Sequence, residues 1–277
     1  MILRLPGREV SFPRRPLVMG IVNINDDSFS GDGSLDPNTA IKQARAMQAA
    51  GAGIIDLGAE SARTNREAIS VGEEIARLQP VIAALRDSPA PPLISVNTWR
   101  PEVVAEILPM GIDLLNDIGA LPDDRNARLC AQHDCALLIM HSVGLPKVPH
   151  TGQHYGDVWS AMLAFFKDKI AMAEDAGVPR EDIVLDPGID FAKQREDNLA
   201  IYRELARLKE FGLPILLPVS RKTVIGEVLG IDTPADRDPG TVACIATGLK
   251  GGANIFRVHN VSAARQALQV LGALAPR

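Results

Sequence analysis

Polar side chains alternate at the end of an apolar stretch near the C-terminus of the chain. Residues 252–260 read GANIFRVHN, so Arg257 and His259 flank Val258 and follow the apolar Phe256. The side chains of a strand alternate between its two faces, so Arg257 and His259 share one face. Both can donate hydrogen bonds, and a guanidinium binds anionic oxygens well. The pair therefore predicts an anion-binding site at the end of a strand.

Seven other apolar runs also end in polar residues. With the run at 255–260 they make eight, all rich in Ile, Val and Leu, and the other seven lie at residues 16–23, 53–60, 92–98, 114–120, 136–142, 183–189 and 214–220. Continuous apolar runs of this length are typical of parallel strands that are buried on both faces. The polar residues at their ends are Asn23, Glu60, Asn97, Asn116, His141, Asp186, Ser220 with Arg221 and Lys222, and Arg257 with His259.

Amphipathic helical stretches separate these runs. Residues 39–52, TAIKQARAMQAAGA, place Ile41 and Met47 on one stripe, and Gly51 is expected to follow the end of the helix. Eight strand–helix units in a chain of 277 residues predict one (β/α)8 TIM barrel that spans residues 1–277. An open doubly wound sheet is the alternative, and it is disfavoured because no GxGxxG turn follows the first strand.

The barrel also predicts where the chemistry lies. The carboxyl ends of barrel strands meet at one mouth, and that mouth carries catalysis, so the polar strand ends predict a single site. Residues 3–12, LRLPGREVSF, alternate around a Pro-Gly turn and predict a short β-hairpin that plugs the opposite, N-terminal mouth.

Composition narrows the class of protein. The net charge of −5 disfavours nucleic-acid binding, which requires a basic surface. The three cysteines show no CxxC spacing and are odd in number, so we expect reduced thiols. No run approaches the ~20 apolar residues of a membrane span, and the first residues do not resemble a signal peptide. These features predict a cytoplasmic protein without a membrane partner.

Eight motifs occur in an order that carries a family resemblance. They are MGIVNINDDSFSGDG (19–33), DLGAESAR (56–63), SVNTWRPEV (95–103), LNDI (115–118), DPGIDFAK (186–193), SRKTVIG (220–226), RDPGT (237–241) and RVHNV (257–261). Together they resemble the dihydropteroate synthase family over essentially the whole chain. The resemblance implies a TIM barrel that condenses 6-hydroxymethyl-7,8-dihydropterin diphosphate with p-aminobenzoate, giving 7,8-dihydropteroate and diphosphate in folate biosynthesis. It also implies Mg²⁺ as the accompanying ion, a homodimer, and a connection to sulfonamides, which mimic p-aminobenzoate.

The resemblance, read with the chemistry of the residues, assigns three groups of binding residues. A pterin presents a guanidine-like edge of N–H donors, which a buried carboxylate such as Asp186 can accept in parallel. The pterin group is Asn97, Asn116, Asp186 and Lys222. The diphosphate group is Asn23, Arg63, Arg257 and His259, with Asn23 as the Mg²⁺ ligand. The aminobenzoate group is Ser220, Lys222, Phe191 and Thr64. The residues expected to act in catalysis are Lys222, Arg257, His259 and Asn97.

Several of these residues also have structural interpretations. Asp186 could be a turn residue before Pro187, and Lys222 could extend its ammonium from a strand end to solvent. Arg257 could form a salt bridge to a neighbouring helix, and His259 could be a core histidine. His141 is left out of the chemistry because a histidine at a barrel strand end often only forms a wall. No base is required, since an arylamine is already a neutral nucleophile at pH 7.

The chain departs from the usual family pattern at several positions. The third strand usually reads SIDT, and Asn97 replaces that aspartate. A carboxylate 4 Å from a cation-like pterin would stabilise it by at most ~4 kcal/mol, so its loss could slow the reaction by up to about three decades. Asp26 or Asp27 is a candidate for restoring this charge. The remaining departures are Asn25 and Asp26 for Thr-Pro, Ala62 for Thr, Thr64 for Pro, and Asn260 for Asp.

Two other functions therefore stay open. Asn97 is compatible with a divergent pterin-binding homologue that has weak or no synthase activity. A pterin-dependent methyltransferase relative is the second, and it is disfavoured because it needs no diphosphate site. The sequence also shows no corrinoid-binding domain, which that methyltransferase would need.

Overall fold

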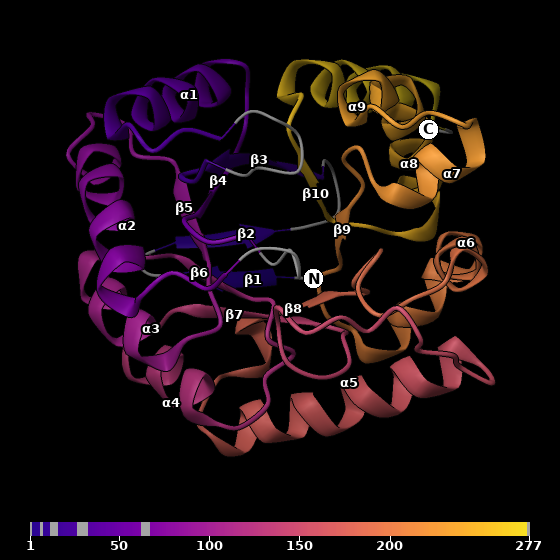
Figure 1. Cartoon of the computed structure of the whole chain (residues 1–277), viewed down its shortest axis with the longest axis horizontal. Coiled ribbons are helices and arrows are strands. Elements are labelled where there is room, and N and C mark those ends of the chain that lie inside the picture. Colours follow the sequence, from indigo (N-terminus) through magenta and orange to yellow (C-terminus); the bar gives the residue numbers. More distant parts are fainter. Residues whose placement is uncertain (1, 6–7, 12–15, 27–32, 62–66, 276–277) are drawn as a thin grey trace.

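The computed structural model describes residues 2–5, 8–11, 16–26, 33–61 and 67–275. Parallel strands form the centre of the molecule and helices surround them (Figure 1). The parallel strands are β3 (Leu17–Asn23), β4 (Ile54–Gly58), β5 (Leu93–Asn97), β6 (Leu114–Asp117), β7 (Ala136–Met140), β8 (Ile183–Asp186), β9 (Leu216–Pro218) and β10 (Ile255–Val258). Each falls within one of the predicted apolar runs.

The sheet closes on itself. Its strands neighbour one another in the order β8-β7-β6-β5-β4-β3-β10-β9. A parallel bridge between Leu185 of β8 and Ile215, just before β9, joins the two ends. The backbone N–H of Leu185 also donates to the carbonyl of Pro214 at 2.9 Å. The prediction of a (β/α)8 barrel is confirmed, and the open doubly wound sheet is excluded.

Helices follow the strands around the outside. They are α1 (Pro37–Ala49), α2 (Val71–Arg86), α3 (Pro101–Ile107), α4 (Arg125–Gln132), α5 (Val158–Asp175), α6 (Arg195–Glu204), α7 (Thr223–Leu229), α8 (Asp238–Gly251) and α9 (Val261–Leu274). The short 3-10 helices are η1 (Leu108–Met110), η2 (Arg180–Asp182), η3 (Leu205–Phe211) and η4 (Pro234–Arg237). Asp36 caps α1, and Gly51 follows its end with φ +99°, as predicted. Among the described helices, none combines the length and apolarity needed to cross a bilayer.

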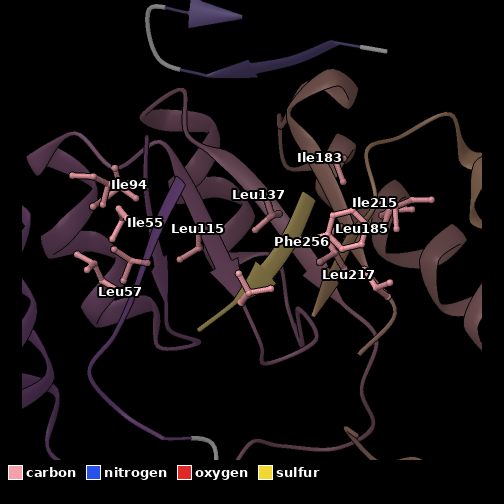
Figure 2. Packing of buried hydrophobic residues seen from close by; sticks show 14 of the residues in the cluster. Ile55, Leu57, Ile94, Leu115, Leu137, Ile183, Leu185, Ile215, Leu217 and Phe256 are labelled. Atoms are coloured by element: carbon pink, nitrogen blue, oxygen red, sulfur yellow. The ribbon is translucent and has the colours of Figure 1, made fainter. Parts of the chain in front are cut away.

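Successive strand residues face two different cores. Ile54 faces the barrel interior with Met19 and Leu93, whereas the next residue, Ile55, joins the layer between strands and helices. Figure 2 shows part of this outer layer, with Ile55, Leu57, Ile94, Leu115 and Leu137 among its members. Apolar residues fill the barrel interior near the starts of the strands. The polar side chains therefore lie at the carboxyl ends of the strands.

The predicted N-terminal hairpin is confirmed. Strands β1 (Ile2–Leu5) and β2 (Arg8–Ser11) pair antiparallel. Leu3 and Leu5 are buried and pack with the residues of the barrel interior. Arg4 forms an ion pair with Glu181, which lies just before β8, at 2.9 Å. The hairpin therefore closes the barrel at the end where the strands begin, as Figure 2 also shows.

Candidate active site

A cavity of ≈ 540 Å³ opens at the carboxyl ends of the strands. The predicted residues that line it are Asn23, Asn97, Phe191, Ser220, Lys222, Arg257 and His259. They come from β3, β5, β10 and the turns after β8 and β9. The fold therefore brings together side chains that are more than two hundred positions apart in the sequence. The predicted residues Arg63 and Thr64 lie outside the described residues.

Asn116 and Asp186 are buried beside the residues that line the cavity. Asn116 pairs in register with Asn97, and its side-chain Nδ2 donates to Asp56 at 3.2 Å. Its Oδ1 atom is buried and has no hydrogen-bond partner among the described residues. A buried acceptor without a donor is costly, so this oxygen suits the N–H edge of a bound ligand.

Asp186 is a buried carboxylate in a cationic environment. Burial raises its pKa from 3.8 to about 6, while the Gly188 N–H, at 2.7 Å, and the charges of Lys222 and Arg257 act in the opposite direction. The turn-residue interpretation is correct in part, because Asp186 does accept this N–H. Its second oxygen lies in the same buried environment and can serve a ligand.

Asp56 is a site residue that the sequence reasoning missed. It is fully buried on β4, and its Oδ2 accepts a hydrogen bond from Nε of Arg257 at 2.7 Å and forms an ion pair with Nη2 at 2.7 Å. Its Oδ1 accepts the Ser95 hydroxyl at 2.6 Å. The signal was present, since Asp56 is an ionisable residue in the middle of an apolar run. The sequence does not show, however, which cation such a carboxylate binds.

The Asp56 contact fixes the place of Arg257. A salt bridge to a neighbouring helix was one interpretation of Arg257, and its partner is instead a buried aspartate on β4. The Arg257 side chain keeps 20% of its surface exposed and lines the cavity. The guanidinium is thus anchored on one side and available to a ligand on the other.

Lys222 is held by the turn after β8. Its Nζ donates to the carbonyl of Ile189 at 2.8 Å and lies 5.2 Å from the centre of the Phe191 ring. Burial lowers the pKa of Lys222, and the carboxylates of Asp190 and Asp186 oppose that effect. Lys222 therefore points into the protein and does not extend to solvent.

A second lysine, Lys193, lines the cavity and was given no role from sequence. Its Nζ donates to the carbonyls of His141 and Phe191 at 3.1 and 3.0 Å. Burial lowers the pKa of Lys193 to about 7, against the attraction of Asp186. The DFAK motif contained this lysine, but nothing local showed that its ammonium folds back toward Asp186.

Ser220 and His259 form a pair. The Ser220 Oγ accepts the backbone N–H of His259 at 3.1 Å and lies 2.7 Å from its ring Nδ1. A hydroxyl that accepts this N–H can donate its own proton to Nδ1, which leaves the ring proton on Nε2. The neighbouring Arg221 instead binds Asp238 at 2.8 Å, which is a structural contact.

The polar strand ends Glu60 and His141 have structural partners. Glu60 forms ion pairs with Arg100 and with Lys147, the latter at 3.1 Å. It also accepts a hydrogen bond from the backbone N–H of Ile69 at 3.1 Å. His141 is buried edge-on against Phe165, and burial lowers its pKa to about 2. Leaving His141 out of the chemistry agrees with this neutral, apolar setting.

Few of the protein oxygens that the structure describes at the site could bind a hard cation. Among the described residues, no cluster of three or more His, Cys, Asp or Glu side chains could hold a metal. The amide of Asn23 lines the cavity, and the nearby Asn25 has a buried Oδ1 without a hydrogen-bond partner in the described part of the chain. Mg²⁺ commonly takes one or two protein oxygens and completes its shell with phosphate and water. Such a sparse donor set fits that mode.

The structure does not bring Asp26 into this cavity. Asp26 borders a second hollow of ≈ 200 Å³, together with Glu67 and Arg77. Asp27 lies outside the described residues. Asp56 instead supplies a buried carboxylate on a strand beside Asn97, because β4 pairs with β5.

Gly188 is required by the turn that carries Phe191 and Lys193. A Cβ at Gly188 would lie 2.0 Å from the carbonyl oxygen of His141, and φ is +65°. We expect Gly188→Ala to lower the free energy of unfolding by about 1–3 kcal/mol beyond the cost of the left-handed backbone conformation alone. Gly212→Ala is the matched control, because φ is +68° and no described atom lies within 4 Å of the added Cβ. Thermal unfolding measures both; equal losses would show that the His141 contact relaxes.

Comparison with known proteins agrees with this geometry. Residues 19–259 match the family model described as pterin binding enzyme. The chain is 41% identical over 263 residues to a dihydropteroate synthase of Synechocystis sp., covering 94% of this chain and 91% of the relative. A structure of the Yersinia pestis dihydropteroate synthase with a sulfonamide drug complex matches with a TM-score of 0.92 and 33% identity, over 99% of this chain and 98% of that one. The Thermus thermophilus enzyme in complex with 4-aminobenzoate matches with a TM-score of 0.88 and 38% identity, over 99% of this chain and 100% of that one. The chain therefore belongs to the dihydropteroate synthase family of pterin-binding enzymes.

Proposed function

We propose that this chain condenses 6-hydroxymethyl-7,8-dihydropterin diphosphate with p-aminobenzoate and releases diphosphate. The observation that carries the proposal is one cavity that combines buried acceptors with cationic groups. Lys222 and Arg257 line it, and both act by their charge on the buried Asp186, while Asn116, whose Oδ1 is buried, pairs in register with the lining residue Asn97. A flat donor-rich heterocycle with an anionic tail is complementary to that arrangement. The whole of residues 1–277 would act as one pterin-binding unit.

The pterin would bind at the inner end of the cavity. The carboxylate of Asp186 would accept two N–H groups of the guanidine-like edge, and Asn116 Oδ1 would accept another. Asn97 would contribute from β5, and the Lys222 ammonium would lie against the ring. Because Asp186 is buried, each of these charge-assisted hydrogen bonds is stronger than it would be in water.

The diphosphate would lie at the outer end, among Asn23, Arg257, His259 and Arg63. The C–O bond to diphosphate breaks and its electron pair leaves with the diphosphate, and the amine nitrogen of p-aminobenzoate then bonds to the methylene carbon of the cation-like pterin. The anilinium proton then passes to solvent. Arg257 and the Nε2–H of His259 would stabilise the charge that builds on the leaving oxygen. Positioning and leaving-group stabilisation supply the rate.

The p-aminobenzoate would lie on the apolar side of the mouth. Phe191 would flank its ring, Lys222 and Ser220 would border it, and Thr64 would complete the wall. We also infer that Mg²⁺ accompanies the diphosphate, with Asn23 as its protein ligand. When bound, the ion supplies additional neutralisation of the leaving group.

The decisive experiment is an assay of the purified protein with Mg²⁺, the pterin diphosphate and p-aminobenzoate. We expect stoichiometric release of diphosphate and formation of 7,8-dihydropteroate, with a lower rate after chelation of the metal. Binding of the pterin without diphosphate release would instead support the divergent homologue that Asn97 leaves open. A rate unaffected by chelation would remove Mg²⁺ from the proposal.

Restoring the family carboxylate provides a further prediction. We expect Asn97→Asp to raise kcat by about tenfold, because a carboxylate facing the cavity stabilises a cation-like pterin. Asn260→Asp is the matched control. Asn260 caps α9 by accepting the Ala263 N–H at 3.0 Å, and its Nδ2 donates to Asp238 at 3.0 Å. Asn260→Asp therefore sets two carboxylates against each other and should lower the unfolding temperature, but Asn260 does not line the cavity, so kcat should stay nearly constant. A fall in kcat for Asn97→Asp would mean that the site is built around the amide.

Two expectations concern the protein as a whole. We infer a homodimer from the family membership, and sedimentation velocity at micromolar concentration tests it. Exposed apolar side chains for such a contact occur on α7 and α9, at Val228, Leu229, Val270 and Leu274. The cytoplasmic location stays a prediction.

A further inference from the structure

The turn between β8 and α6 supports Lys222 on both sides of Asp190. The carbonyl of Ile189 accepts the hydrogen bond from Lys222 Nζ at 2.8 Å, and the ring of Phe191 lies 5.2 Å from the same nitrogen. Asp190 is the residue between them. A change in its backbone therefore moves both contacts of the Lys222 ammonium.

The Asp190 side chain also binds the backbone that carries Lys222. Its carboxylate accepts the N–H groups of Thr223 at 2.6 Å and Val224 at 3.2 Å, the first two residues of α7. Lys222 immediately precedes that helix, and its own side chain makes no cap hydrogen bond to the described residues of α7. The Asp190 side chain thus holds the backbone next to Lys222, while Ile189 and Phe191, the two neighbours of Asp190, contact the Lys222 ammonium.

Asp190 adopts a backbone conformation that most residues avoid. Its φ is +69°, in the left-handed region, where glycine is least strained. The buried amide of Asn198 maintains this conformation, because its Oδ1 accepts the Asp190 N–H at 2.8 Å. Its Nδ2 in turn donates to the carbonyl of Gln194 at 3.1 Å. A strained residue fixed by a buried partner points to a use for its side chain.

The charges around Lys222 indicate that the Asp190 carboxylate acts on the Lys222 ammonium. Burial lowers the pKa of Lys222, and Asp190 is the foremost of the charges that oppose this, followed by Asp186 on β8. Arg257 on β10 lowers it further, and the ammonium of Lys193, whose pKa Lys222 lowers, faces the same space. Loss of the Asp190 charge should therefore let Lys222 release its proton at lower pH.

We propose that Asp190 is a positioning residue that fixes the Lys222 ammonium over the Phe191 ring by joining the β8–α6 turn to the start of α7. The consequence for catalysis rests on the function proposed above. The placement of Lys222 does not depend on that function, so the two can be tested separately.

Three variants separate these effects. Asp190→Gly removes both the cap and the charge while relieving the backbone strain. Asp190→Asn keeps an accepting oxygen and tolerates the left-handed conformation but removes the charge. Asp157→Gly is the control, because Asp157 caps α5 through the N–H groups of Trp159 and Ser160, both at 3.1 Å, and does not line the cavity.

Steady-state kinetics supply the first readout. We expect Asp190→Gly to lower kcat/KM for the pterin diphosphate by about tenfold to a hundredfold, and Asp190→Asn to recover most of it at pH 7. Asp157→Gly should stay within about twofold of the unaltered protein. Equal kinetics in the two glycine variants would overturn the proposal.

The second readout needs no substrate. In protein labelled with ¹⁵N-lysine, the Lys222 signal is assigned by its loss in Lys222→Met and followed by NMR as pH rises. We expect its midpoint to fall by about one pH unit in Asp190→Asn. An unchanged midpoint would overturn the role of Asp190 even if the protein is an active synthase. A lowered midpoint in a protein that makes no dihydropteroate would sustain the placement and reject the function.

Discussion

Replacement of Arg257 by methionine should lower kcat/KM for diphosphate release by at least about a thousandfold, the largest effect of any single change proposed for this chain. The guanidinium faces the expected position of the leaving group. The same change also leaves Asp56 fully buried without its cation. Removal of one partner from a buried pair costs about 3–5 kcal/mol, so the variant should also unfold at lower temperature.

A double variant distinguishes catalysis from folding. Asp56→Asn combined with Arg257→Met removes the isolated charge and keeps the Ser95 and Asn116 contacts available to an amide. We expect much of the lost stability to return, because the cost came from an unpaired buried carboxylate. Turnover should not return. If kinetics recover together with the unfolding temperature, Arg257 serves the fold and not the leaving group.

Asp186→Asn should separate ligand affinity from stability. Loss of the carboxylate that accepts the pterin edge should weaken pterin binding by about a hundredfold, as expected for charge-assisted hydrogen bonds in a buried site. Isothermal titration calorimetry measures this without turnover. The same variant should unfold at a higher temperature than the unaltered protein at pH 7.

The stability effect follows from the sign of the pKa shift. Burial raises the pKa of Asp186 from 3.8 to about 6, so the folded chain holds this proton more tightly than the unfolded chain. The contribution of Asp186 to the free energy of unfolding is therefore most favourable below pH 4, and it declines as pH rises to 6. Above pH 6 the ionised group costs at most about 3 kcal/mol. Asparagine removes that cost, and a lower unfolding temperature at pH 7 would contradict this account.

Pterin binding should follow the opposite trend with pH. The ionised carboxylate accepts the N–H groups of the pterin, so the affinity of the unaltered protein for the pterin should fall as pH drops through about 6. The affinity of Asp186→Asn should depend less on pH in this range, because asparagine does not titrate. Asp117 and Asp182 also have pKa values raised to about 6 by burial, but neither lines the cavity. They should affect unfolding without affecting affinity. Lys193 lines the cavity and has a pKa lowered to about 7, so the loss of the step near pH 6 in Asp186→Asn is what assigns that step to Asp186.

The sequence alone determined the barrel and most of the residues around its mouth. Runs such as 136–142 and 214–220 are apolar on both faces until their last residues, and a strand buried on both faces is the arrangement that satisfies such a run. Their polar ends then had to share one mouth, which brought Asn23, Asn97 and Arg257 into a single site. The hairpin at 3–12 was also predictable, because its alternation and its Pro-Gly turn are both local.

Only the tertiary structure decided the partners of the charged groups. Asp56 and Arg257 are 201 positions apart, and they meet because β10 closes the barrel next to β3, which pairs with β4. Lys193 folds back to two carbonyls, and Asp190 reaches across to α7, contacts that no periodicity encodes. Periodicity reports which face of an element is buried, because burial depends on local spacing. The partner of a buried charge depends on which strands become neighbours when the sheet closes, and that is a property of the whole chain.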